Sequence, residues 1–256
     1  MHPFLALSIY NLITLFLVMI GIILCKKKLK DQKSKDITMK ITSIMVVILH
    51  YSSLYVEFFQ KGSAIVDATM LLPIYPCHIS MWLLVISSFI KKERKIYPII
   101  SEFTFFGGTI CGLIGVLFNI NFLNTPNFLD YDILKGLLSH TVMIFGTLNL
   151  FYLGYVKIDI IRNIKSVTYG LILFVMIGFV INTIYYVCGF DPVNAMFMLE
   201  PPIPELPFFN FFTMGLLGLL LLFGLLNLYE AVKLPKEKRW LTTIRKEKRN
   251  KWCTNY

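Results

Sequence analysis

The sequence lacks the cysteine pattern of a zinc protein or of a disulfide-stabilised scaffold. Its five cysteines are scattered, and no Cys-x-x-Cys pair or cysteine–histidine ligand spacing occurs. We therefore expect no metal site and no disulfide framework. Most of these thiols are expected to be small buried apolar groups. They are Cys25, Cys77, Cys111, Cys188 and Cys253.

Acidic residues are also scarce, with 15 Asp and Glu against 25 Lys and Arg, which gives a formal net charge of +10. A basic balance can indicate a nucleic-acid-binding protein. Here, however, the basic residues lie between long apolar runs and in the C-terminal tail. This distribution is typical of a membrane protein, and we expect no nucleic-acid partner.

Apolar residues, by contrast, are abundant: they make up 56% of the chain, and the mean hydropathy is +0.68. A helix needs roughly 20 apolar residues to cross the hydrocarbon core of a bilayer. Seven stretches qualify: 3–25, 40–59, 68–90, 96–118, 134–156, 166–188 and 206–229. They predict an all-α polytopic membrane protein, with a bundle of about seven transmembrane helices over residues 1–232. A basic cytoplasmic tail is expected over residues 233–256.

The basic residues predict how this bundle is oriented. All but two of them, Lys61 and Lys135, lie around the junction of the first two stretches, after the third and fifth stretches, or in the tail. By the positive-inside rule these segments are cytoplasmic and the N-terminus lies outside. We expect a multi-pass protein of the cell membrane, with membrane lipids as its partners.

A few polar groups lie inside the apolar stretches, where each is costly and is therefore a candidate for function. His50 and Glu57 share one face of the second stretch, and His140 and Asn182 lie toward the outer ends of the fifth and sixth stretches. Together they indicate a polar cavity that opens to the outer side. Structural hydrogen bonding between helices is the alternative, and it is the preferred interpretation for Asn182 taken singly.

Two prolines, Pro73 and Pro76, interrupt the third stretch. Because Pro76 cannot donate an N–H group to the carbonyl of Leu72, the helix is expected to be kinked, or broken with a new helix beginning at Pro76. In the second case Cys77 lies in the first turn of a half-helix. Free N–H groups and the helix dipole favour a thiolate and a developing oxyanion there. The alternative is a buried, inert thiol.

The residue that would activate Cys77 is expected on another helix. His78 is its neighbour in the chain, and adjacent helical residues do not face one another. His140 is our first choice for the base and His50 our second.

Glycines are concentrated in the fourth stretch, at positions 107, 108, 112 and 115. Gly108 and Gly112 form the small-xxx-small pattern that lets membrane helices approach closely. A substrate groove is conceivable here, but tight helix packing is the preferred interpretation.

The order of these motifs resembles that of the YwaF-like bacterial integral membrane proteins and their animal relative, transmembrane protein 164. The matching residues are Glu57, Pro73, Pro76-Cys77-His78, His140, residues 194–199 (NAMFML), Pro201 and Pro202. The resemblance spans roughly the second to the seventh stretch. The chain departs from the expected pattern at Ala195, where an aromatic residue is usual.

The resemblance implies a seven-helix fold and, for the animal member, a phospholipid acyltransferase that carries the acyl group on the cysteine of its Pro-Cys-His motif. In this chain Cys77 would be the acyl carrier, His140 the general base and acid, and His78 an orienting or oxyanion-donating group. No cofactor is required when the donor is a lipid. The residues expected to line the substrate cavity are His50, Glu57, Asn182 and Asn194.

A membrane protein without covalent chemistry is the alternative function. A broken helix and ionisable groups near the midplane suit a transporter, a channel or a ligand-binding protein equally well. Cys77 discriminates between the two classes, because an enzyme of this kind needs the thiol and a binding cavity should tolerate Ser or Ala.

Overall fold

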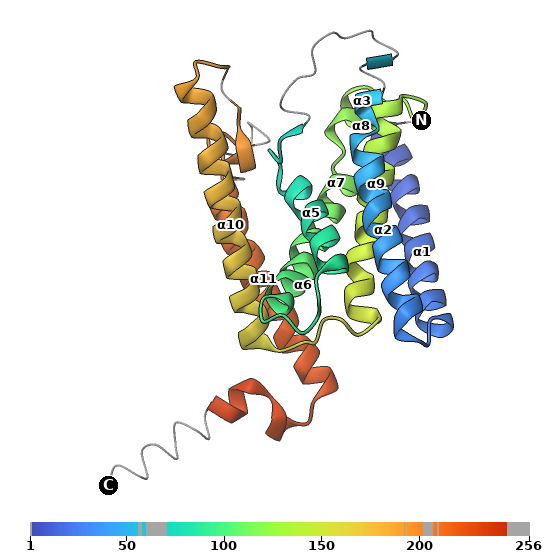
Figure 1. Ribbon diagram of the computed structural model, residues 1–256, viewed down its shortest axis with the longest axis vertical. Helices are drawn as coiled ribbons and strands as arrows, with labels where there is room; N and C mark the ends of the chain where they lie inside the picture. Colours follow the sequence, from blue (N-terminus) through green and yellow to red (C-terminus); the bar gives the residue numbers. More distant parts are fainter. Residues whose placement is uncertain are drawn as a thin grey trace.

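The computed structural model describes residues 2–55, 58–59, 71–191, 193–201, 207–208 and 210–244, and within these residues the regular structure is all helical. The long helices are α1 (Pro3–Lys28), α2 (Gln32–Tyr51), α9 (Tyr131–Tyr152), α10 (Ile160–Val187) and α11 (Phe211–Lys233) (Figure 1). A composite helix consists of α6 (Tyr97–Phe103), the π-helical turn η2 (Thr104–Gly108) and α7 (Thr109–Leu117). The shorter elements are α3 (Ser53–Tyr55), α5 (Pro76–Phe89), α8 (Ile120–Asn124), η3 (Ala195–Phe197) and η4 (Lys236–Lys238).

Six helices in the described part of the chain are long and apolar enough to cross a membrane. They are α1, α2 with α3, the composite of α6 to α8, α9, α10 and α11. The seventh, α5, is apolar but has only 14 residues, which corresponds to about 21 Å of helix. The all-α membrane bundle is therefore confirmed, with six full-length helices and one short one.

The predicted stretches differ from the helices at their ends, and the starts of the second and third stretches differ most. α2 begins at Gln32 rather than at residue 40, because the carboxylate of Asp31 caps it by accepting a hydrogen bond from the Ser34 N–H at 2.8 Å. Its first turns are polar, so hydropathy alone placed the start too late. The third stretch was predicted over residues 68–90, but the helix α5 begins only at Pro76.

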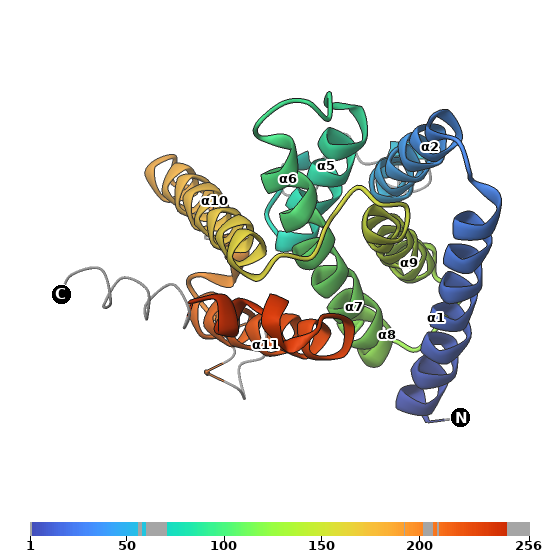
Figure 2. The same ribbon diagram turned by 90° about the horizontal axis from the view of Figure 1, so that it is seen from below.

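Helix α9 lies between α1, α2 and α7 in the interior of one half of the bundle (Figure 2). Its contact with the composite helix depends on glycines that leave no room for a side chain. A Cβ atom on Gly108 would lie 2.7 Å from Thr147, and one on Gly112 would lie 2.7 Å from Ile144. The prediction of tight packing along the glycines of this helix is thus confirmed.

The other half of the bundle consists of α10, which packs against α6, η3 and α11. Its core includes the edge-to-face pair of Phe103 and Phe174, whose ring centroids are 5.1 Å apart. α11 buries little of its surface: Leu222, Leu226 and Glu230 are its buried residues. Many of its other apolar side chains, among them Leu217 and Leu220, are exposed and available to lipid.

The basic segments lie together at one end of the molecule. The turns that follow α1, α5 and α9, and the chain after α11, all lie at the lower end of Figure 1, whereas the N-terminus and α8 lie at the upper end. The basic segments that the sequence pattern groups together therefore also lie together in space. The assignment of this end to the cytoplasm remains a prediction from the positive-inside rule.

Candidate functional site

The chain is extended before Cys77, and α5 begins at Pro76 with Tyr75 as an extended N-cap residue. The Leu72 carbonyl, which a continuous helix would pair with residue 76, instead accepts the N–H of Ile74 at 2.8 Å. The ring of His78 also contacts it, with 3.4 Å between Nδ1 and the carbonyl oxygen. The predicted helix break between Leu72 and Cys77 is confirmed, and its cause is the proline at the first helical position.

Cys77 is the second residue of α5, and its thiol is half-buried. Its side chain packs against a core cluster that includes Met39 and Val46 of α2. Cys111 of α7 is a close neighbour, near enough for the two sulfur groups to interact electrostatically. Among the described residues the Cys77 thiol forms no hydrogen bond to a histidine, so the predicted pairing with His140 is not formed in this conformation.

Three histidines from three different helices converge beside this motif. The rings of His50 on α2 and His78 on α5 are 4.3 Å apart between centroids. His140 on α9 lies within electrostatic range of both, as does Lys135, one turn closer to the start of α9. The structure therefore brings together all three histidines that the sequence singled out, and it adds a cation that was not among the expected site residues.

The backbone fixes the orientation of His140. Its Nδ1 lies 2.7 Å from the carbonyl oxygen of Gly136, one turn earlier in α9. Since a carbonyl can only accept, Nδ1 carries the proton in this contact and Nε2 of the neutral ring is left as the basic nitrogen. His78 has the same arrangement toward the Leu72 carbonyl. Both rings therefore direct their basic nitrogen away from the backbone.

The two asparagines of the predicted site organise the loop between α10 and α11. Asn182 accepts a hydrogen bond from the Ala195 N–H at 2.9 Å and donates one to its carbonyl at 3.3 Å. Asn194 donates to the carbonyl of Glu200 at 2.7 Å and accepts the N–H of Leu199 at 3.0 Å. Both amides are thus used to hold the loop, and their contact with a substrate remains a prediction.

This loop is attached to the segment before Cys77, a contact that the sequence did not indicate. The Met196 N–H donates to the Ile74 carbonyl at 2.8 Å, and the rings of Tyr75 and Phe197 stack with centroids 5.2 Å apart. Met196 and Phe197 have φ angles of 58° and 54°. Such left-handed backbone is costly for these residues and persists only where surrounding contacts enforce it.

Glu57, the remaining residue of the predicted site, lies outside the described residues. Glu102, which lies near the inner end of its helix, is buried and belongs to a separate contact. Arg162 donates to one carboxylate oxygen at 2.5 Å and Ser166 donates to the other at 2.8 Å. This pair joins α6 to α10 and is structural, since a buried carboxylate without its partners would be strongly destabilising.

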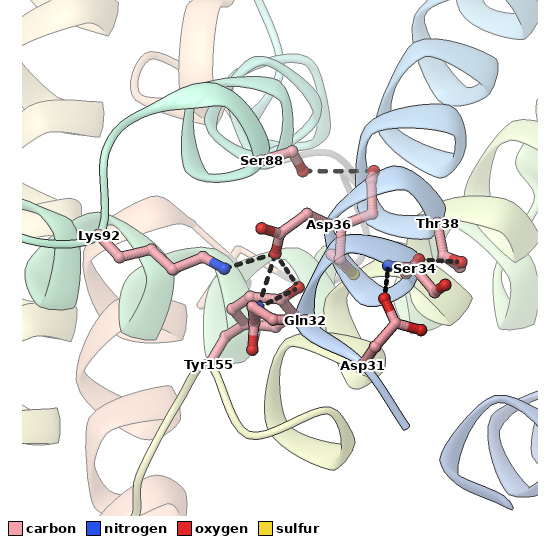
Figure 3. Close-up of polar contacts among 9 residues, drawn as sticks. Asp31, Gln32, Ser34, Asp36, Thr38, Ser88, Lys92 and Tyr155 are labelled. Atoms are coloured by element: carbon pink, nitrogen blue, oxygen red, sulfur yellow. Dashed lines mark hydrogen bonds and ion pairs between the residues drawn. The ribbon is translucent and has the colours of Figure 1, made fainter. Parts of the chain in front are cut away.

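A second polar cluster lies at the basic end of the bundle and joins three segments (Figure 3). The Asp36 carboxylate of α2 accepts hydrogen bonds from Gln32 at 2.7 Å and from the Tyr155 hydroxyl at 2.5 Å, and it forms an ion pair with Lys92. Burial and the hydrogen bond to Asp36 raise the pKa of Tyr155, so its hydroxyl remains a donor. The cluster ties α2 to the turns that follow α5 and α9.

No group of three His, Cys, Asp or Glu side chains converges as a metal site would require within the ranges that the structure describes. The surroundings of His78 instead combine three imidazoles and an ammonium group, and the Cys77 thiol precedes His78 in the chain. Together these groups offer a nucleophile and bases to a substrate, or polar contacts to a ligand.

Comparisons with known proteins identify the family of the chain. No curated protein and no solved structure matches it significantly. The model of the TMEM164 family matches residues 3–229, which is most of the chain and includes every residue of the predicted site. The chain is therefore a multi-pass membrane protein that belongs to the TMEM164 family.

Proposed function

We propose that this protein is a membrane-embedded phospholipid acyltransferase that carries the acyl group on Cys77. The observation that supports this most directly is the position of Cys77 in the first turn of a half-helix, one residue before His78, whose ring contacts that of His50. Pro76 has no N–H group, and the His78 N–H donates to the Tyr75 carbonyl at 3.0 Å. The N–H group of Cys77 has no helical carbonyl to bind, and it is available to an oxyanion that forms next to the thiol.

The reaction would proceed in two balanced steps. In the first, the Cys77 sulfur attacks the ester carbonyl of a donor phospholipid, a carbon–sulfur bond forms, and the carbon–oxygen bond to the glycerol oxygen breaks. The thiol proton passes through a histidine to that leaving oxygen. In the second, the hydroxyl oxygen of an acceptor lipid attacks the thioester carbonyl, a new carbon–oxygen ester bond forms, and the carbon–sulfur bond breaks. The hydroxyl proton passes through the histidine to the sulfur, and the thiol is regenerated.

The hydrogen bonds of His140 and His78 support a different role for each ring in the reaction. His140 is the general base and acid, because its Nδ1 is held by Gly136 and its Nε2 is free to exchange a proton. His78 is held in the same tautomer and lies in the same turn as Cys77, so it orients His140, or donates to the oxyanion once its Nε2 has taken up a proton. The proposal requires a movement of α5 relative to α9 that brings Cys77 to His140, and catalytic contacts are commonly looser before substrate binds.

A non-covalent function is favoured by one specific observation. The Cys77 thiol packs against apolar core residues and has no histidine partner among the described residues. In that case the broken helix and the histidines would bind a polar ligand or line its path, as in transporters with interrupted helices.

Replacement of the thiol separates the two functions. The purified protein in lipid nanodiscs is incubated with a phospholipid that carries an alkyne-tagged acyl chain, and the labelled residue is mapped. Cys77→Ala should abolish both the label and acyl transfer, with thermal unfolding unchanged because a small side chain is lost. Cys111→Ala is the matched control, since it removes the neighbouring half-buried thiol.

His140→Ala should slow transfer by about 10²–10⁴-fold. Turnover that survives in Cys77→Ala would refute Cys77 as the acyl carrier, and a wild-type protein that neither takes up the label nor transfers an acyl group would refute the enzyme.

A further inference from the structure

An open groove of about 450 Å³ lies at the end of α5 opposite to Cys77. Its lining residues are Val85, Ile86, Phe89, Ile90, Lys91 and Arg94. The volume is within the range of sites that hold small molecules. Since about 20 Å of helix separates Pro76 from Phe89, this groove is distinct from the histidine site.

The floor of the groove is apolar and faces the surroundings of the bundle. Ile86 and Phe89 are 42% and 52% exposed, whereas Leu84 and Ser87 on the opposite face of α5 are buried. In a membrane this exposed face lies against hydrocarbon, and the turn after α5 is at the edge of the bundle in Figure 2. The floor therefore suits an acyl chain.

The rim of the groove carries two cations without acidic partners. The ion pairs of the described residues include Lys92, which binds Asp36 and lies 4.3 Å from the centroid of the Tyr155 ring, but neither Lys91 nor Arg94. The Arg94 N–H donates to the Lys91 carbonyl at 3.2 Å, which folds these residues into one turn. Two neighbouring cations that are unpaired among the described residues are a ready site for an anion.

A third cation flanks the same apolar floor. The Lys40 ammonium lies 5.3 Å from the centroid of the Phe89 ring, in a cation–π contact. Glu93 is exposed in the turn that carries the rim but does not line the groove. The local charge at the mouth of the groove is therefore positive.

We propose that this groove binds an anionic phospholipid, with its phosphate between Lys91 and Arg94 and one acyl chain along Ile86 and Phe89. Charge complementarity and the apolar floor support this occupant, because the guanidinium group binds phosphate through two parallel hydrogen bonds. The groove is also at the end of the bundle that carries the basic segments, where anionic lipid headgroups are attracted. The lipid is a resident ligand at a site remote from Cys77, so the proposal does not depend on acyl transfer.

Native mass spectrometry of the detergent-purified protein tests this site directly. The protein is titrated with phosphatidylglycerol and with phosphatidylcholine of identical chains, and the bound fraction of each is measured. Wild type should retain phosphatidylglycerol more tightly. The double variant K91Q/R94Q should weaken its binding on the order of tenfold, as expected for two surface charges. The matched control K27Q/K28Q removes two exposed cations from the same end of the molecule and should change little.

Two further measurements distinguish a lipid site from non-specific attraction of anions to the basic surface. Phe89→Ala should weaken binding of both lipids, because it removes part of the floor. Inorganic phosphate at millimolar concentration should not displace the lipid. Equal losses in the two double variants, equal binding of the two lipids by wild type, or displacement by free phosphate would each overturn the proposal. The replaced residues are exposed, so the variants should still fold. The single variant Arg94→Gln gives the same test with half of the charge change.

Discussion

At the scale of single residues, the imidazole of His140 lies against Gly115 of α7 where any side chain would collide with it. A Cβ atom on Gly115 would be 2.3 Å from Cδ2 and 2.4 Å from Nε2 of that ring. The ring cannot turn aside easily, because its Nδ1 is bound to the Gly136 carbonyl at 2.7 Å. The glycine therefore determines where the basic nitrogen lies.

Gly115→Ala should displace this nitrogen and lower acyl transfer by about 10²-fold, the cost of misplacing a catalytic group by about 1 Å. Formation of the Cys77 label should slow as well, since the same base takes the thiol proton in the first step. Gly218→Ala is the control: it makes the same change in a helix, but nothing lies within 4 Å of the new Cβ. Full activity of Gly115→Ala would show that His140 is not the base.

At the scale of elements, the loop that contains η3 holds the extended segment before α5. Asn182→Ala would leave the N–H of Ala195 without a partner, while the Ala195 carbonyl would keep only the Met198 N–H at 3.3 Å, and Ala195 is fully buried. The loss should cost roughly 1–3 kcal/mol of stability. Hydrogen–deuterium exchange should become faster in residues 193–201 and also in residues 72–78, because Met196 pairs with Ile74. Thr183→Ala, at an exposed neighbouring position, is the control and should change the exchange rate of neither segment. Faster exchange confined to residues 193–201 would show that the loop does not support α5.

The sequence predicts some of these elements well and others poorly, for identifiable reasons. Hydropathy located the long helices, and the missing N–H of Pro76 correctly placed the break before Cys77. Hydropathy failed at the start of α2, where the cap by Asp31 keeps polar residues helical. Contacts between distant segments, such as Tyr75 with Phe197, leave no pattern in one sequence. For the same reason Lys135 was counted only as one of the two basic residues away from the basic side, and not as a neighbour of the histidines.

At the scale of the whole molecule, the bundle is polarised between its two ends. The end with Cys77, α8 and the N-terminus carries the histidine site, and the other end carries the basic turns and the Asp36 cluster. This separation assigns different leaflets to the two proposed lipid sites. The histidine site would draw its lipids from the outer leaflet, and the groove at the end of α5 would take its phospholipid from the inner leaflet.

Cysteine accessibility tests this polarity in cells. In a background without the native cysteines, Asn127→Cys places a thiol in the exposed turn before α9, and Lys95→Cys places one in the exposed turn after α5. A membrane-impermeant maleimide should label the first in intact cells and the second only after permeabilisation, because the basic turns are retained on the cytoplasmic side. Lys95 is preferred to Lys92, whose side chain is bound to Asp36. The reverse labelling would place the histidine site on the cytoplasmic side. Labelling of both thiols from the same side would contradict the helix arrangement, since these turns lie at opposite ends of the bundle.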